Sequence, residues 1–261
     1  MKKVLIPYFL AGSGHLVSAI AIQHYLRKKR PSWEVRLFEP SEELGLEPLD
    51  GLYKRSWNAI LKRPILSAII FFLAENIFSF IPYAVNRRVT RAATPAMTEF
   101  LNEYKPDFVI TTHWGCGHVV AEAMKAGAPV CPLFVTRNDL GGAYRLQKVD
   151  CDRIIVMSPE AEHAFRKLRV PAERILQVNP VVRPEFLAGN TDGAGEPDSL
   201  SGEKRNGLKI LLTSGGEGIG NIKKTSAMIL ETADRIGRAV GIDILTGRNE
   251  QLRCELTRDL D

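Results

Sequence analysis

The feature that most constrains the fold of this chain is a repeated alternation of short apolar runs with longer segments of helical periodicity. The first run, Lys3–Phe9, is apolar enough for a strand buried on both faces of a parallel sheet, and a helix is predicted from the turn after it to about Lys29. Strands that alternate with helices favour right-handed βαβ crossovers and a doubly wound parallel sheet. Further strands are predicted at Trp33–Phe38, Pro106–Thr112, Pro129–Thr136, Arg153–Met157 and Ile175–Val178, and further helices at Gly117–Ala126 and Pro159–Leu168.

A change of composition divides the chain into two parts. Residues 187–207 are rich in Gly, Ser, Asp and Pro and have few apolar side chains, which is typical of a flexible linker. We therefore predict an α/β protein with a Rossmann-like domain at 1–186, a linker at 187–207 and the beginning of a second Rossmann-like domain at 208–261. Two predicted strands cannot bury a sheet, so this second part is either incomplete or dependent on packing against the first.

Two glycine-rich turns each follow a predicted strand and open a predicted helix. They read AGSGH at residues 11–15 and GGEGIG at residues 215–220. Ligands of open α/β sheets bind beyond the carboxyl ends of the strands, and N–H groups at a helix N-terminus suit a phosphate or an oxyanion. Either turn alone can serve packing only, but the pair suggests one ligand held from two domains. Neither turn has the usual GxGxxG placement, which disfavours a nicotinamide cofactor.

Polar side chains follow the predicted strands at this same edge of the sheet. A neutral imidazole is expected at His15, because a helix N-terminus disfavours its charged form, and it could accept a proton. Its alternative role is a hydrogen bond to backbone alone. His113 and His118 follow the next strand, and His113 is expected to bind the substrate. Asp139 follows the strand after that and could orient a base or hold a hydroxyl. A purely structural role remains the alternative for these three residues.

Five stretches of the chain, in their order and spacing, resemble a known family. They are GSGHLVSA (12–19), KPDFVITTH (105–113), PLFVTRNDL (132–140), the stretch at 152–186 and ILLTSGGEGIGN (210–221). The resemblance is to the processive diacylglycerol glycosyltransferases, which include monogalactosyldiacylglycerol synthase and are similar to the peptidoglycan N-acetylglucosaminyltransferase that acts on a lipid intermediate. It implies a GT-B fold in which the first domain takes the lipid acceptor and the second binds a UDP-sugar. It also implies inversion at the sugar without a metal.

The resemblance assigns roles to individual residues. His15 takes the position of the family's proposed base, within a substrate-binding loop that contains Gly12 and Gly14. Asp139 matches the aspartate of a Thr-Asp motif, although Asn138 stands in place of the threonine. The residues expected to bind the donor diphosphate are Ser214, Gly215, Gly216 and Gly218.

The sequence also departs from the family's pattern. Ala143 and Tyr144 stand where the family usually has a histidine, and Asn179 stands in place of a glycine. The family's second domain is much longer than residues 208–261, and the part that reads the uracil and ribose is not among them. The 261-residue chain by itself is therefore expected to transfer little or no sugar.

Positive charge is concentrated in residues 52–91. They contain seven Lys and Arg residues and one acid, Glu75, so their net charge is +6 in a chain of net charge +5. The apolar stretch at 64–85 within them is long enough to span a bilayer, but Glu75, Asn76 and Pro82 disfavour a span. We expect a helix pair lying in the interface of an anionic membrane, with a buried helix hairpin as the alternative. The residues expected to contact the membrane are Ile69, Phe72, Phe78, Arg87, Arg88 and Arg91.

The remaining composition limits the cofactors and partners. The four cysteines, at 116, 131, 151 and 254, have no metal-ligand spacing and are expected to be reduced thiols of a cytosolic protein, so no metal is expected. The apolar start of the chain is short and contains Pro7, which favours a strand over a signal peptide. No cofactor is expected apart from a UDP-hexose as co-substrate, and no nucleic acid partner.

These observations together predict a glycosyltransferase that moves a hexose from a UDP-sugar to diacylglycerol or a related lipid. It would lie peripherally on the cytoplasmic face of the cell membrane. One alternative is a non-catalytic relative that binds lipid. The other is a GT-B enzyme that acts on a polyprenyl-linked cell-wall intermediate.

Overall fold

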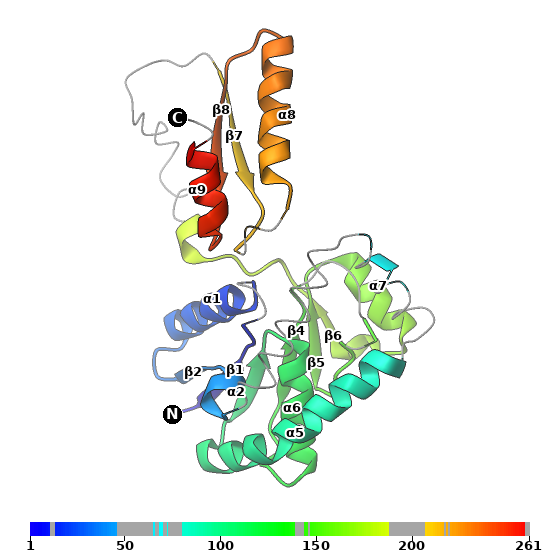
Figure 1. The fold of residues 1–261 in the computed structure, drawn as a ribbon. Coiled ribbons are helices and arrows are strands. Elements are labelled where there is room, and N and C mark those ends of the chain that lie inside the picture. The colour runs from blue at the N-terminus through cyan, green and yellow to red at the C-terminus, as the bar shows by residue number, and fades with distance from the viewer. Residues whose placement is uncertain are drawn as a thin grey trace. The chain divides into compact units, whose positions relative to one another are not determined.

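The computed structural model divides into two compact units, Met1–Ala188 and Gly189–Asp261, each of which is described by itself (Figure 1). The structure describes residues 1–10, 14–45, 65, 68–69, 72, 80–138, 144–145, 147–187, 207–216, 218 and 220–258. Nearly all of the predicted linker at 187–207 lies outside these residues.

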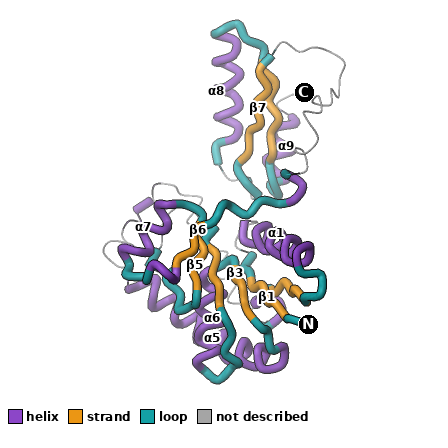
Figure 2. The backbone as a smooth tube through the Cα atoms, turned by 180° about the vertical axis from the view of Figure 1, so that it is seen from behind, coloured by secondary structure: helices purple, strands orange, loops and turns teal. Residues whose placement is uncertain are grey.

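The first unit is built on one parallel sheet, which confirms the predicted fold class. Its strands lie in the order β2-β1-β3-β4-β5-β6, and every pair of neighbours is parallel (Figure 2). All six predicted strands are present. They are β1 (Lys3–Pro7), β2 (Glu34–Phe38), β3 (Phe108–Thr111), β4 (Leu133–Thr136), β5 (Arg153–Val156) and β6 (Ile175–Gln177).

Helices cover both faces of this sheet, as a doubly wound fold requires. Successive strand residues point to opposite faces, so Val4 and Ile6 pack with α1 (Gly14–Lys29) in one apolar cluster. Leu5 packs in a second, larger cluster on the other face. That cluster is closed by α5 (Phe80–Tyr104), α6 (Trp114–Lys125) and α7 (Pro159–Lys167).

Local capping decides where these helices begin. The Ser158 hydroxyl accepts from the Ala161 N–H at 3.2 Å, and α7 starts directly after it with a proline at its first position. The helix predicted from Gly117 starts three residues earlier, at Trp114, because the side chain of His113 caps it. The shorter helical elements of this unit are α2 (Pro40–Glu43), η1 (Ala172–Arg174) and η2 (Pro184–Phe186).

The second unit repeats the strand–helix alternation that the sequence predicts. Strands β7 (Leu208–Thr213) and β8 (Val240–Leu245) pair in parallel over all six residues of each. They are joined to α8 (Ile222–Arg235) and α9 (Glu250–Arg258). Within the described residues the pair leaves apolar side chains in solvent, since Leu211 is 64% exposed.

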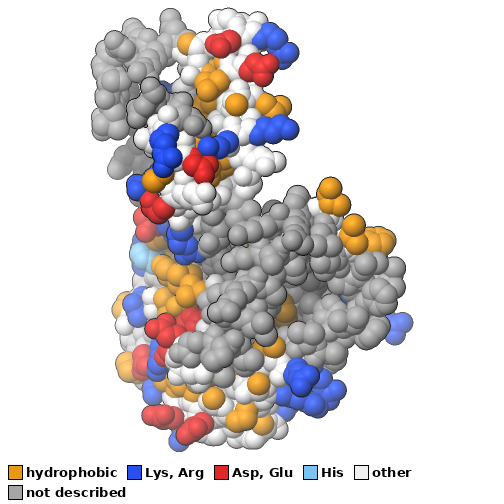
Figure 3. Space-filling view, viewed as in Figure 1, with side chains coloured by type: hydrophobic (Ala, Val, Ile, Leu, Met, Phe, Trp, Pro, Cys, Tyr) orange, Lys and Arg blue, Asp and Glu red, His pale blue; other side chains and the backbone are white. Residues whose placement is uncertain are grey.

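Only part of the segment predicted to meet a membrane is described. Phe78 lies outside the described residues, whereas Ile69 and Phe72 are 49% and 61% exposed. Arg87, Arg88 and Arg91 lie exposed on α5. Figure 3 shows hydrophobic side chains and a group of Lys and Arg side chains exposed on one face of the first unit. Among the described residues, the structure contains no helix with both the length and the apolar character that crossing a bilayer demands.

The larger apolar cluster predicts a severe effect of truncating Phe165. Its ring is fully buried and packs edge-on against Tyr144, with 5.6 Å between ring centroids. Phe165→Ala leaves a cavity that the surrounding side chains fill only in part, so it should lower the free energy of unfolding by about 3–5 kcal/mol. Val130→Ala, at a side chain 85% exposed, is the control and should change stability by less than about 0.5 kcal/mol in urea denaturation. Equal effects of the two substitutions would contradict this packing.

Candidate functional site

The candidate site is organised around Thr112, the residue that follows β3. The Nδ1 atom of His15 lies 2.6 Å from the Thr112 carbonyl oxygen, and the Thr112 hydroxyl donates to the His15 carbonyl oxygen at 2.9 Å. A carbonyl oxygen only accepts, so Nδ1 carries the hydrogen and the neutral ring has its lone pair on Nε2. The backbone hydrogen bond that the sequence offers as an alternative role is therefore present. It also sets the tautomer that a base requires.

His113 lies directly beside His15. The two ring centroids are 4.6 Å apart and the ring planes are nearly perpendicular, at 85°. The Gly115 N–H donates to Nδ1 of His113 at 3.0 Å, which makes this ring the N-cap of α6. Only 5% of the residue is exposed, which leaves little of it to contact a substrate. Burial, followed by the charges of His15 and His118, holds the pKa of His113 well below its usual range.

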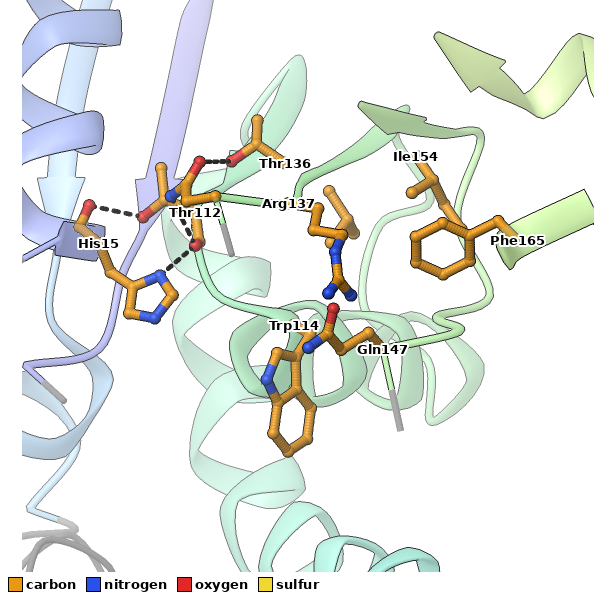
Figure 4. A pocket seen from close by; sticks show the side chains of 10 residues that line it. His15, Thr112, Trp114, Thr136, Arg137, Gln147, Ile154 and Phe165 are labelled. Carbon is orange, nitrogen blue, oxygen red and sulfur yellow. Dashed lines mark hydrogen bonds between the residues drawn. The ribbon is translucent and has the colours of Figure 1, made fainter. Parts of the chain in front are cut away.

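A small pocket opens at this edge of the sheet and contains polar groups that the sequence analysis did not single out. Arg137 and Gln147 are buried in its wall, and Figure 4 shows the two side chains pointing toward one another. The guanidinium carbon of Arg137 lies 3.8 Å from the centroid of the Tyr144 ring. The Asn138 amide donates to the Thr112 carbonyl oxygen at 3.2 Å. The pocket is lined by His15, Thr112, Trp114, Val135, Thr136, Arg137, Asn138, Gln147, Ile154 and Phe165.

A sequence signal for Arg137 existed. It is the first residue after the apolar strand β4, at the carboxyl end where ligands of such sheets bind. A single arginine at a predicted strand end is a weak signal, because the sequence does not show that its side chain turns inward and stacks on Tyr144.

The first glycine-rich turn is described only in part. Gly12 and Asp139 lie outside the described residues, so the structure does not place them. Gly14 is the first residue of α1, and a Cβ atom built on it meets no atom within 4 Å. Packing within the described part of the protein therefore does not require glycine at this position.

The second glycine-rich turn packs against the loop that follows β8. The Arg248 N–H donates to the Gly216 carbonyl oxygen at 2.8 Å, and the Asn249 amide donates to the Gly218 carbonyl oxygen at 3.1 Å. Gly218 has a φ of 59°, and a Cβ atom there would lie 2.2 Å from the Thr246 carbonyl oxygen. The backbone therefore requires glycine at 218 for its own packing.

Two other residues of this turn, Ser214 and Gly215, have a polar atom or a space that the described residues do not use. Gly215 also has a positive φ, of 78°, but a Cβ atom there would meet nothing within 4 Å. Its N–H donates to the Thr213 hydroxyl at 3.3 Å, and the Gly218 N–H donates to the Gly215 carbonyl oxygen at 3.2 Å. Among the described residues, the buried hydroxyl of Ser214 has no hydrogen-bond partner, which is unusual for a buried polar atom.

The described residues hold no group of three or more His, Cys, Asp or Glu side chains that could bind a metal ion. Cys116, Cys131 and Cys151 are buried free thiols, and burial is the first cause that raises the pKa of each. A protonated thiol is a poor nucleophile and a poor metal ligand.

Each unit has the strand–helix alternation of a GT-B-like α/β fold, and solved structures with TM-scores of 0.50 or more support this assignment. UDP-GlcNAc 2-epimerase from Neisseria meningitidis bound to UDP-GlcNAc is similar with a TM-score of 0.53 and 15% identity, over 98% of this chain and 68% of that one. UDP-N-acetylglucosamine 2-epimerase from Rickettsia bellii has a TM-score of 0.50 at 14% identity, over 98% and 64%. The apo form of the lipopolysaccharide outer core galactosyltransferase WaaB has a TM-score of 0.48 at 15% identity, over 100% and 65%.

At these identities the likeness to solved structures establishes the fold alone. The chain spans about two thirds of the length of the structures it resembles. No protein-family model matches the sequence, and no curated protein matches it either.

The depressed pKa of His113 predicts a loss of stability in mild acid. Unfolding returns the ring to water, where its pKa is near 6.5, so the unfolded chain binds a proton that the native state does not. This contribution to stability is complete above that pH and is lost as the pH falls below it toward the folded pKa, by at most about 1.4 kcal/mol per pH unit. Urea denaturation between pH 7.5 and pH 5 should show a smaller loss for His113→Asn than for the wild type. An identical loss in both proteins would contradict the assignment.

Proposed function

We propose that this protein is a glycosyltransferase that moves a hexose from a UDP-sugar to a hydroxyl group of diacylglycerol or a related lipid. The observation that carries the proposal is the hydrogen bond from His15 Nδ1 to the Thr112 carbonyl oxygen. It places a hydrogen on Nδ1 at the carboxyl edge of the sheet, so that the neutral form of the imidazole has its lone pair on Nε2, as a general base for a hydroxyl group requires. The GT-B-like fold and the family resemblance of the sequence support the same reaction.

The proposed reaction is a single displacement. Nε2 of His15 accepts the proton of the acceptor hydroxyl while the hydroxyl oxygen attacks the anomeric carbon of the hexose. The bond between that carbon and the UDP oxygen breaks, and UDP leaves with the electron pair. The products are the glycosylated lipid, with inverted configuration at the sugar, and UDP, and the proton remains on the imidazole until it passes to solvent. Asp139 is proposed to orient the base or the hydroxyl.

We propose that the second unit binds the donor diphosphate through Ser214, Gly215, Gly216 and Gly218. The turn lies between β7 and the N-terminus of α8, where the helix dipole favours an anion. The open space at the Cβ position of Gly215 allows a phosphate to approach the backbone. A phosphate oxygen would also give the Ser214 hydroxyl the partner that it lacks. Gly218 contributes by holding the turn in shape.

We propose that the lipid is reached from the cytoplasmic face of an anionic membrane. Ile69 and Phe72 provide exposed apolar side chains, and three exposed arginines follow on α5. Apolar side chains next to basic ones are typical of a surface that lies in the membrane interface.

A second candidate function is epimerisation of a UDP-sugar. It is favoured by one observation, that two solved structures similar to this chain with TM-scores of 0.50 or more are UDP-GlcNAc 2-epimerases. An epimerase needs no lipid acceptor. Incubation with a UDP-sugar in the absence of lipid, followed by NMR of the sugar nucleotide, separates the two candidates by whether a new epimer forms.

The proposed base predicts the effect of His15→Ala on transfer. General-base assistance contributes about 10²- to 10⁴-fold, so in a protein in which residues 1–261 are followed by a complete donor-binding domain, His15→Ala should lower kcat by at least about 100-fold with the fold intact. The measurement is transfer of radiolabelled hexose from UDP-hexose to diacylglycerol in mixed micelles. His24→Ala is the matched control, since it removes an exposed imidazole from the same helix. Near-normal turnover in His15→Ala would show that the imidazole of His15 is structural.

The proposed membrane surface predicts the effect of reversing its charge. Each basic side chain near an anionic leaflet contributes about 1 kcal/mol, so changing Arg87, Arg88 and Arg91 together to Glu should weaken binding to phosphatidylglycerol vesicles by more than about tenfold. The matched control reverses the charge of Lys28, Lys29 and Arg30, which are exposed at the end of α1 and its flank. It makes the same change of net charge elsewhere. Co-sedimentation that falls equally for both variants would contradict a specific membrane surface.

A further inference from the structure

We propose that His113 is a positioning residue for His15, whose ring holds the His15 imidazole in place and thereby keeps its tautomer fixed. This role differs from the substrate contact that the sequence predicts for His113, which stays a prediction. The inference rests on the proposed function in one respect, namely that His15 acts as the base.

The ring of His113 is itself firmly held. It lies 5.1 Å from the Trp114 ring at an angle of 27° and 5.3 Å from the Phe9 ring, measured between centroids. It is 5% exposed, so these contacts and that with His15 enclose nearly all of it. A ring packed on several sides has few other rotamers available.

Hydrogen bonds fix the direction in which this ring faces. The Gly115 N–H donates to its Nδ1, which places the hydrogen of the neutral ring on Nε2. The backbone is held as well, because the His113 N–H donates to the Thr111 hydroxyl at 3.2 Å. A Cβ atom at position 115 would lie 2.9 Å from Nδ1, so glycine at that position allows the helix to approach the ring.

The fixed ring of His113 contacts the ring of His15, whose Nδ1 atom donates to the Thr112 carbonyl oxygen. The two rings are in an edge-to-face arrangement, one of the preferred geometries for aromatic pairs. Thr112, whose carbonyl oxygen accepts from Nδ1 of His15, is the residue next to His113 in the chain. The His15 ring is therefore contacted by two residues that are adjacent in the chain, through the Thr112 carbonyl oxygen and the His113 ring. Without the ring of His113, the His15 side chain could rotate away from the carbonyl oxygen and exchange its tautomers.

Two substitutions separate this role from helix capping. His113→Asn keeps a side-chain acceptor at a position where asparagine is a favoured N-cap, but it removes the ring. His113→Phe keeps a ring and removes the acceptor. His163→Asn is the matched control, since it makes the same change at an exposed position on α7.

The first measurement is the ¹⁵N spectrum of the histidine rings in the 261-residue protein at pH 7.5, with His15 assigned by the His15→Ala variant. In the wild type, Nε2 of His15 should have the shift of an unprotonated nitrogen and Nδ1 that of a protonated one. In His113→Asn both shifts should move toward the average of two exchanging tautomers. His113→Phe and the control should retain the wild-type shifts of His15.

The second measurement is sugar transfer by the same substitutions, made in a protein in which residues 1–261 are followed by a complete donor-binding domain. His113→Asn should lower kcat by at least about tenfold, within the range that misplacing a catalytic group produces, and leave KM for the UDP-sugar unchanged. Unchanged shifts of His15 in a folded His113→Asn protein would overturn the inference, since His113 would then only cap the helix. If no sugar is transferred even when residues 1–261 are followed by a complete donor-binding domain, the proposed function fails, and the spectra still decide whether His113 positions His15.

Discussion

The candidate site depends on a reciprocal pair of hydrogen bonds between the end of β3 and the start of α1. His15 donates to the Thr112 carbonyl oxygen and accepts from the Thr112 hydroxyl, across 97 positions of the chain. The Thr112 N–H donates to the Pro7 carbonyl oxygen, and its own carbonyl oxygen also accepts from Asn138. The ends of β1, β3 and β4 therefore meet at one residue. Because a single carbonyl group sets both the place and the tautomer of His15, the register of the sheet determines where the lone pair of the base lies.

The sequence predicts the sheet well because strands buried on both faces are continuous runs of apolar residues, which are easily recognised. Each of the six runs of apolar residues in the first unit becomes a parallel strand, in an order that the turns alone do not specify. The start of α6 is less well predicted, since the apolar pattern begins at Gly117 whereas the helix begins at Trp114. Histidine is an uncommon N-cap, so the sequence at His113 predicts a ligand contact and gives no signal for the start of a helix.

The site is predicted less well than the fold, for a physical reason. Sequence places a polar residue at a strand end, but its role depends on partners that approach from other elements. Both His15 and His113 lie at the predicted edge, yet only the structure shows that their rings meet and that one of them is almost fully buried. Arg137 and Gln147 come together in the wall of the pocket although ten positions separate them in the chain.

The two turns share a glycine-rich sequence, but the physical reason for glycine differs from one position to the next. At Gly218 an added side chain would collide with backbone, so the protein's own packing accounts for the residue. At Gly14 and Gly215 the same addition would meet nothing within 4 Å. Gly215 still requires glycine for its positive φ, but Gly14 has no such requirement, because it is not among the glycines with a positive φ. Of these three glycines, Gly14 is therefore the one that the described residues do not account for, and it stands next to His15, the proposed base.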